Sequence, residues 1–295
     1  MSDVAHAAQL IREGRLVAFP TETVYGLGAN ALDAAAVERI FAAKNRPHTS
    51  PLIVHVDSVE MAKRYATAWP DAAEALAQRY WPGPLTLVLP KNSAIPDIVT
   101  AGLPTVGLRM PDHPLAIDLI RAAGVPIAAP SANRFTELSP TEAEDVPERL
   151  ADFVLDGGPA RVGIESTVLS LVDGPVLLRP GVIPVPEIEA VVGRVAIAGE
   201  VAGAHPSPGM HRRHYRPATP LYLLPAGEAA PNGRGRVLKT GDDARGFAAS
   251  LYRRLHELDG QGLDWIAVEM PPDTPEWAGV LDRLRRAESE RTDRS

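Results

Sequence analysis

Cysteine is absent from this sequence of 295 residues. Its absence excludes disulfide bonds, thiolate nucleophiles and cysteine-ligated zinc, and it fits a reducing cytoplasm. Long apolar runs are absent as well, since no stretch approaches the ~20 residues that a membrane-spanning helix needs. The N-terminal segment MSDVAHAAQLIREGRL is charged and has no apolar signal core. We therefore expect a cytoplasmic protein with no membrane association.

An excess of basic residues is also missing. The sequence has 30 Lys and Arg residues against 37 Asp and Glu residues, which gives a formal net charge of -7. Such a balance does not favour non-specific nucleic-acid binding by the whole surface. Any anion-binding site must therefore be built from a local cluster of cations.

Familiar short motifs of catalysis are not found either. There is no G-x-x-x-x-G-K-[ST] phosphate loop, no G-x-S-x-G nucleophile turn and no H-E-x-x-H zinc motif. GLGAN, at residues 26–30, begins like a dinucleotide-binding loop but lacks the third glycine of that motif. The residues alone thus identify no nucleophile and no general base.

What the sequence does contain is an alternation of strand-like and helix-like patterns over residues 1–195. Short apolar runs indicate strands, and apolar residues at helical spacing indicate helices, so we expect an α/β layered domain. The predicted strands lie at 15–20, 51–56, 85–90, 105–110, 125–133, 151–158, 166–172 and 176–181. The predicted helices lie at 4–13, 33–46, 59–69, 71–81, 114–124 and 185–192.

The composition changes after residue 195. Residues 196–219 are rich in glycine and proline, carry a basic clump and show little periodicity, which predicts a linker. Strand and helix patterns return in residues 220–295, which predicts a second, smaller α/β domain. Its expected elements lie at 221–225, 235–240, 244–258, 265–270 and 277–287.

Polar side chains stand close to the ends of several predicted strands. Ligands of open α/β sheets bind beyond the carboxyl ends of strands, where loops converge. If these loops meet, four cations face a lining of Thr, Ser and Asn groups, which suits a polyanion because arginine forks pair with phosphate or carboxylate oxygens. The four cations are Lys44, Arg46, Arg109 and Arg179.

Several polar residues, including two of these cations, also have a simpler interpretation. Lys44 and Arg46 follow a predicted helix, where cations complement the helix dipole. His55 lies in an apolar run, which is typical of a core histidine. The segment HRRHY, at residues 211–215, reads as a solvated basic linker or as a histidine pair for a metal, although no acidic or cysteine companions stand nearby.

Eight ordered blocks nevertheless resemble one family. FPTETVYGLGANA, IFAAKNRP, PLIVHV, WPGPLTLVL, TVGLRMPDHP, PIAAPSAN, GIESTV and LLRPG closely resemble the YrdC/Sua5 family of threonylcarbamoyl-AMP synthases over about residues 5–190. SPGMHRRHYRPATP resembles the linker of the two-domain Sua5 branch, and the tail resembles its C-terminal domain. The resemblance implies a YrdC-like twisted mixed sheet flanked by helices at 1–195, a linker that covers the site at 196–219, and a small Rossmann-like α/β domain at 220–295. This last domain looks shortened between residues 224 and 236.

The resemblance also implies an activity. Members of the family convert L-threonine, bicarbonate and ATP, with Mg²⁺, into threonylcarbamoyl-AMP and pyrophosphate. A separate transferase complex then uses the product to form N6-threonylcarbamoyladenosine at position 37 of tRNA. Adenylation of this kind needs positioning and charge neutralisation rather than a protein nucleophile. No side-chain ligand for a metal is expected.

Site residues follow from the same motifs. The resemblance implies an L-threonine site formed by Thr23, His55, Arg109, Ala129 and Ser166, with Arg109 pairing the carboxylate. It implies a nucleotide site formed by Lys44, Arg46, Ser50, Thr105, Ser131, Asn133, Ser139, Arg179 and Tyr215. In this set Lys44 and Arg46 stabilise charge during catalysis, and Tyr215 reaches back from the linker as a lid, with possible help from His214.

Two departures and two rival functions accompany the resemblance. Ser50 stands where the family usually has Asn, and SANRFTELSPT changes the usual loop before Ser139. The first rival is a double-stranded RNA or tRNA-binding module without synthase activity. The second is a carbamoyltransferase-like use of the fold, as in hydrogenase-maturation proteins, whose extra zinc-finger segments this chain lacks. The pair K-x-R and S-x-N, together with the linker, favours the synthase.

Overall fold

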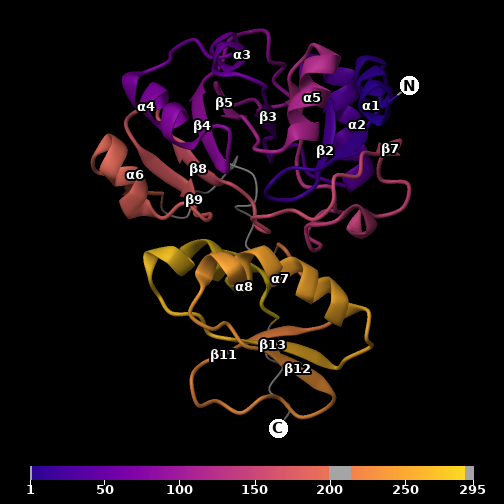
Figure 1. Ribbon diagram of the computed structural model, residues 1–295, viewed down its shortest axis with the longest axis vertical. Helices are drawn as coiled ribbons and strands as arrows, with labels where there is room; N and C mark the ends of the chain where they lie inside the picture. Colours follow the sequence, from indigo (N-terminus) through magenta and orange to yellow (C-terminus); the bar gives the residue numbers. More distant parts are fainter. Residues whose placement is uncertain (1, 199–213, 290–295) are drawn as a thin grey trace.

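The computed structural model describes residues 2–198 and 214–289, which form a large and a small domain (Figure 1). The large domain contains a mixed sheet of ten strands among these described residues, in the order β10-β9-β8-β4-β5-β3-β6-β2-β1-β7. The strands are β1 Val17–Phe19, β2 Gly26–Asn30, β3 Ile53–His55, β4 Leu85–Pro90, β5 Thr105–Arg109, β6 Ile127–Ala128, β7 Phe153–Val154, β8 Thr167–Ser170, β9 Val176–Arg179 and β10 Ala196–Ile197.

Helices flank this sheet in two groups (Figure 1). One group contains α1, α2 and α5, and α1 packs against α5. In the other group α4 packs against α6. One apolar core joins both groups to the sheet. The helices are α1 Asp3–Arg12, α2 Ala34–Lys44, α3 Val59–Lys63, α4 Asp71–Tyr80, α5 Pro114–Ala123, the 3₁₀ turn η1 Ala143–Asp145, and α6 Val185–Val192.

The small domain is a parallel three-stranded sheet, in the order β11-β13-β12, with α7 and α8 between it and the large domain (Figure 1). Its core is continuous with Val24, Leu138 and Ile164 of the large domain. The chain passes from β11 to β12 through residues 225–234 without forming a helix or strand. The elements are β11 Leu221–Leu224, β12 Gly235–Leu238, α7 Ala244–Asp259, β13 Trp265–Glu269, η2 Pro275–Trp277 and α8 Ala278–Ala287.

Local sequence signals explain several of these boundaries. The side chain of Asp33 caps α2 by accepting hydrogen bonds from the backbone N–H groups of Ala35 and Ala36. Helix α5 begins at Pro114 and ends at Gly124, whose φ of 71° belongs to the left-handed region that glycine favours. Asp243 caps α7 in the same way as Asp33 caps α2.

Strand β2 was not expected, because GLGAN resembled a loop. The structure pairs it with β1 in an antiparallel ladder. At Gly28 a Cβ would lie 2.8 Å from both the Phe19 ring and the Ile127 side chain, so this glycine permits close packing inside the sheet rather than a phosphate loop. The two glycines in this run have low strand propensity, so the sequence did not predict the strand.

Two further expectations need correction. The helix expected at 59–69 is wrong beyond α3, because Ala66 bridges to Lys91 and the Thr67 N–H donates to the Pro90 carbonyl, 2.9 Å away. These residues therefore extend the end of β4 instead of continuing the helix. The first two linker residues form β10, which pairs with β9. Within the part of the chain that the structure describes, no helix is long and apolar enough to cross a membrane.

Candidate functional site

A cavity lined by both charged and apolar residues lies at the carboxyl ends of three strands of the large sheet. His55, Arg109 and Arg179 are the last residues of β3, β5 and β9, and His55 stands beside Arg109 in the parallel register of β3 and β5. The cavity has a volume of about 510 Å³ including its open mouth. Its position agrees with the expected meeting of loops at the carboxyl ends of strands.

All five residues expected to bind L-threonine line this cavity. They come from the β1–β2 connection, from the ends of β3 and β5, from the segment after β6 and from the segment before β8. The set consists of Thr23, His55, Arg109, Ala129 and Ser166. Their roles toward threonine remain a prediction, but the structure places them around one space.

His55 is buried and uncharged. Burial lowers its pKa to about 3, and the nearby Arg109 charge acts in the same direction. Its Nδ1 atom has no hydrogen-bond partner among the residues described. The ring packs edge-on against Phe19, with 5.8 Å between the ring centroids. His55 therefore combines a core position with an uncharged ring at the cavity wall.

Arg109 is held by a carboxylate that sequence analysis missed. Its Nη2 atom lies 2.7 Å from Oε1 of Glu22, and the two side chains of this ion pair are 4% and 1% exposed. The Nε atom of Arg109 also donates to the Gly83 carbonyl, and Glu22 accepts a hydrogen bond from the Asp112 N–H. Glu22 thus fixes the guanidinium at the cavity wall. The sequence signal was a glutamate in FPTETVYG, directly after a buried strand.

Arg46 lines the cavity on the side expected to hold the nucleotide. Its Nη2 atom donates to the Ser50 hydroxyl at 2.6 Å and to the Pro51 carbonyl at 3.1 Å. Burial lowers the pKa of Arg46 to about 10, so the side chain stays cationic at neutral pH. Ser50 does not line the cavity, and instead it orients Arg46.

Lys44 lies behind the cavity wall rather than in it. Its ammonium group donates to the Ser131 carbonyl at 2.7 Å, to the Asn133 carbonyl and to the Asn133 side-chain oxygen. Burial, followed by the charge of Arg46, lowers the pKa of Lys44 well below its usual value. Lys44 therefore ties the end of α2 to the SAN loop, from which Ser131 lines the cavity.

The nine expected nucleotide residues consequently fall into two groups of four and one separate residue, Thr105. Arg46, Ser131, Arg179 and Tyr215 line the cavity, whereas Lys44, Ser50, Asn133 and Ser139 lie behind it. Thr105 lies at the start of β5 and lines a smaller neighbouring cavity, which shares Ile53 with the first. At about 3.3 Å per residue, Thr105 is roughly 13 Å along the strand from Arg109. Contacts of all nine with a nucleotide remain predictions.

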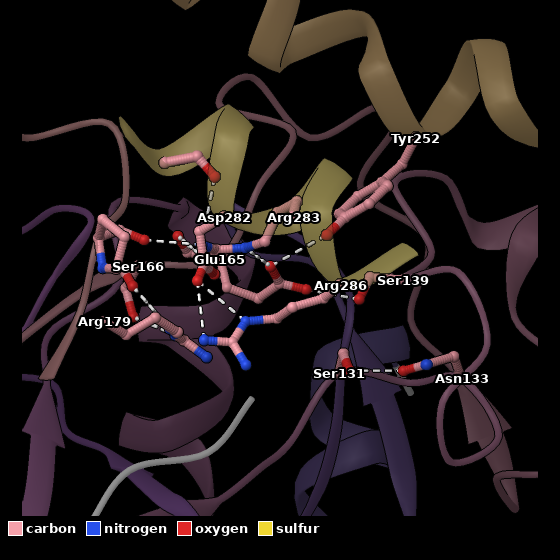
Figure 2. Close-up of polar contacts among 12 residues, drawn as sticks. Ser131, Asn133, Ser139, Glu165, Ser166, Arg179, Tyr252, Asp282, Arg283 and Arg286 are labelled. Carbon is pink, nitrogen blue, oxygen red and sulfur yellow. Dashed lines mark hydrogen bonds and ion pairs between the residues drawn. The ribbon is translucent and has the colours of Figure 1, made fainter. Parts of the chain in front are cut away.

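Glu165 is a second carboxylate that sequence analysis missed, and it lines the cavity. Figure 2 shows it among Ser139, Tyr252 and Arg283. Its Oε1 accepts a hydrogen bond from the Ser139 hydroxyl at 2.6 Å. Its Oε2 contacts Arg283 Nε at 2.8 Å and the Tyr252 hydroxyl at 3.3 Å, both from the small domain. Sequence reasoning could not find these partners, because they follow Glu165 by 87 and 118 positions.

Linker residues close the cavity on one side. His214 and Tyr215 line it, with their ring centroids 4.2 Å apart. Tyr215 is buried with a φ of 63°, and the guanidinium of Arg283 lies 5.4 Å from its ring centroid. Tyr215 thus lies at the cavity, as expected, and its role as a lid over ATP remains a prediction. The rest of the linker motif, at 207–213, lies outside the described residues.

The chemistry of the wall favours an anionic ligand. Three arginines line it, and of the two nearby carboxylates Glu22 pairs with Arg109 and Glu165 pairs with Arg283. Within residues 2–198 and 214–289, no three His, Asp or Glu side chains are grouped to hold a metal ion. Among the described residues, the Thr23 hydroxyl contacts the Thr21 hydroxyl and the Ser166 hydroxyl contacts the Thr86 hydroxyl, so neither is paired with a histidine base.

Two family models account for nearly the whole chain. The Sua5/YciO/YrdC family model, described as "Telomere recombination", matches residues 9–181. The model described as "Threonylcarbamoyl-AMP synthase, C-terminal domain" matches residues 183–289. The chain belongs to the Sua5/YciO/YrdC family. It has both domains of the Sua5 type.

Relatives in this family resemble the chain over almost its full length. The threonylcarbamoyl-AMP synthase of Pyrococcus abyssi is 43% identical over 95% of this chain and 92% of the relative. That of Bacillus subtilis is 43% identical over 96% of this chain and 92% of the relative. The crystal structure of P. abyssi Sua5 complexed with L-threonine matches at a TM-score of 0.89 and 41% identity, over 96% and 93% of the two chains. The expected Sua5-type α/β fold is confirmed.

Proposed function

We propose that this protein is an L-threonylcarbamoyladenylate synthase, which makes threonylcarbamoyl-AMP and pyrophosphate from L-threonine, bicarbonate and ATP. The observation that carries the proposal is the cavity in which the five threonine-motif residues, Arg109 among them, meet two further arginines, Arg46 and Arg179. Two relatives at 43% identity bear this activity in their names, and a Sua5 structure with L-threonine shares the fold. We place the reaction in the cytoplasm, upstream of the separate complex that transfers the threonylcarbamoyl group to tRNA.

The threonine half of the cavity is suited to a zwitterion. Arg109, oriented by Glu22, presents its guanidinium to the substrate carboxylate, and such pairs are strong when buried. Neutral His55 lines the cavity without repelling the substrate amine. Thr23 and Ser166 add hydroxyl groups, which are hydrogen-bonded to the hydroxyl groups of Thr21 and Thr86 respectively. Threonine would be held without any covalent bond to the protein.

The chemistry proceeds in two steps on this scaffold. Bicarbonate dissociates into CO₂ and hydroxide, and the neutral threonine amine attacks the carbon of CO₂. The N–C bond forms as one C=O π bond opens onto oxygen, and the nitrogen gives up a proton that joins the hydroxide as water, which leaves a carbamate. A carbamate oxygen then attacks the α-phosphorus of ATP, and the bond to the β-phosphate oxygen breaks, releasing pyrophosphate. Arg46 and Arg179 line the same cavity, and in this proposal their charges stabilise the negative charge that grows on the phosphates.

Magnesium is proposed to enter as part of the MgATP substrate. The described residues form no cluster of three metal-ligating side chains, and the cavity carboxylate Glu165 is engaged by Arg283. Mg²⁺ usually binds through substrate phosphates with few protein carboxylates, so this lining suits it. When bound, the ion would neutralise charge on the departing pyrophosphate.

The RNA-binding function is the second candidate. It is supported only by the arginines of the cavity, and 30 basic residues against 37 acidic ones give it no broader support. Binding of this type weakens steeply with salt and has no need of threonine. The synthase proposal accounts for the threonine-motif residues, and the RNA proposal does not.

The test is pyrophosphate release from MgATP with L-threonine and bicarbonate each present or omitted. The synthase proposal predicts release only when both are present, with threonylcarbamoyl-AMP identified by mass. Release without threonine, or no release by well-folded protein that binds both substrates, would contradict it. Salt-sensitive RNA binding in the absence of any turnover would favour the second candidate.

A further inference from the structure

Glu165 presents a problem for a site that takes ATP. Its carboxylate lines the cavity that we propose receives a triphosphate, and it lies in the segment directly before Ser166. An unpaired buried carboxylate there would repel the nucleotide, because charges interact strongly where water is excluded. Something must neutralise Glu165 when ATP binds.

Arg283 of α8 supplies that positive charge from the other domain (Figure 2). It is 1% exposed and is the largest of the fully buried side chains. Its Nε donates to Glu165 Oε2 at 2.8 Å, and its Nη2 donates to the Glu165 carbonyl at 3.1 Å. Its Nη1 donates to the Pro180 carbonyl at 2.7 Å. One guanidinium therefore holds two loops of the large domain.

Both of these loops carry cavity residues. Glu165 precedes Ser166, and Pro180 follows Arg179. Arg179 in turn donates through Nε to the Ser166 carbonyl at 3.1 Å, so the two loops are also tied to each other. Arg283 thus lies behind Ser166 of the threonine set and Arg179 of the nucleotide set. It touches neither proposed substrate position itself.

Close backbone packing fixes the small domain against the same loops. A Cβ at Gly279 of α8 would lie 2.5 Å from the Gly181 carbonyl oxygen. A Cβ at Gly163 would lie 2.3 Å from the Ala248 carbonyl oxygen of α7. Real side chains do not tolerate such distances, so both helices seat directly on the backbone of the GIESTV and RPG segments. The contact with Arg283 is therefore part of a built interface.

We propose that the small domain is a positioning element of the nucleotide site, in which Arg283 neutralises Glu165 and fixes the loops that carry Ser166 and Arg179. Docking of α8 then completes the positive charge of the cavity. This inference rests on the proposed synthase function, since it assigns the nucleotide half of that site. Arg283 is a positioning residue, and its effect on ATP passes through Glu165.

The test is a double-mutant cycle, which compares Arg283→Met, Glu165→Gln and the double variant with the wild type. Arg283→Met removes the ion-pair partner of Glu165 and leaves its carboxylate with only the more distant charge of Arg179 and the Ser139 hydrogen bond. KM for ATP should therefore rise about 10- to 100-fold while KM for threonine changes less. Glu165→Gln removes the negative charge that Arg283 neutralises, so its KM for ATP should not show the rise expected for Arg283→Met. The double variant should recover most of the ATP affinity lost in Arg283→Met, because the repelling carboxylate is gone.

The matched control is Arg245→Gln. Arg245 of α7 also forms an ion pair across the domains, with Glu187 at 2.9 Å, but the two side chains are 71% and 41% exposed. Loss of this exposed pair should leave both KM values unchanged. Arg283→Lys, which keeps the charge without the guanidinium fork, provides an intermediate variant if Arg283→Met fails to fold.

Calorimetric binding of a non-hydrolysable ATP analogue to the same variants separates this inference from the proposed function. If wild-type protein makes no product but the binding cycle behaves as described, the synthase proposal fails and the inference holds. An Arg283→Met protein that binds the analogue within about twofold of wild type overturns the inference. So does a double variant that binds no better than Arg283→Met, because a purely structural role predicts that outcome.

Discussion

Two buried arginine–glutamate pairs flank the cavity, and they differ in which partner faces the ligand. In the pair inside the large domain, Arg109 lines the cavity and Glu22 supports it from behind, at 2.7 Å. In the pair across the domains, Glu165 lines the cavity and Arg283 supports it from behind, at 2.8 Å. The first arrangement presents a fixed cation, and the second cancels an anion.

The difference shows how the same ion pair can serve two purposes. A buried pair contributes little net stability, because desolvation offsets the attraction, but removing one partner is strongly unfavourable. Loss of the inner pair, Arg109–Glu22, therefore acts on the proposed contact with the threonine carboxylate. Loss of the outer pair acts on the charge of the site and on how the two domains fit together.

The largest effect is expected from Arg109→Met. This change removes the proposed partner of the threonine carboxylate and strands the buried Glu22, so kcat/KM for threonine should fall about 10³-fold. Steady-state pyrophosphate release with varied threonine measures it. Arg161→Gln is the matched control, because Arg161 forms an exposed pair with Asp112 near the same loop. A kcat/KM for threonine within a factor of a few of wild type would exclude Arg109 from the site.

A smaller effect is expected from acid. Burial raises the pKa of Glu165, but the charges of Arg283 and Arg179 and the Ser139 hydrogen bond outweigh it, and the pKa falls to about 2. Because this lies below the pKa of an unfolded glutamate, its contribution to stability is full above about pH 4.5 and is lost as the pH falls toward 2. We expect about 2 kcal/mol of unfolding free energy from this group to disappear between pH 5 and pH 3.

Urea unfolding of wild type and of Glu165→Gln at both pH values measures this contribution. The glutamine variant has no titrating group at the position, so its decline with acid should be shallower by the stated amount. Parallel declines in the two proteins would show that the outer pair does not hold its charge as the structure indicates.

The smallest effect concerns a third arginine, which no carboxylate supports among the described residues. Arg46 is held by the Ser50 hydroxyl at 2.6 Å and by the Pro51 carbonyl. Ser50→Ala removes one hydrogen bond to a charged group, worth about 1 kcal/mol, so KM for ATP should rise about fivefold. Titration of ATP in the release assay tests this, with threonine kept saturating. A rise as large as that of Arg283→Met would contradict the ranking.

The large domain could be predicted closely from sequence because local signals agree with the fold there. The strand expected at 85–90 is β4, and the α2 cap at Asp33 and the α5 stop at Gly124 lie where their residue types predict. Strand β2 was missed because Gly26 and Gly28 lower strand propensity, and their role depends on Phe19 and on a distant strand.

The site was predicted unevenly for a related reason. The cavity-lining residues lie within short motifs, so Arg109, Ser166 and Arg179 could be recognised along the chain. Glu22 and Glu165 lie in the same motifs, but their importance depends on partners far away in sequence, such as Arg283. Burial and pairing are tertiary properties, and no spacing rule reports that a carboxylate will face a cation 118 residues later.

The most direct test of the central claim is to supply ¹³C-labelled bicarbonate with MgATP and L-threonine and to analyse the adenylated product by mass spectrometry. The account predicts a threonylcarbamoyl-AMP that carries the labelled carbon, formed together with pyrophosphate and lost when threonine is omitted. An adenylate without the label, or labelled product in the absence of threonine, would contradict the claim that this protein joins bicarbonate to threonine.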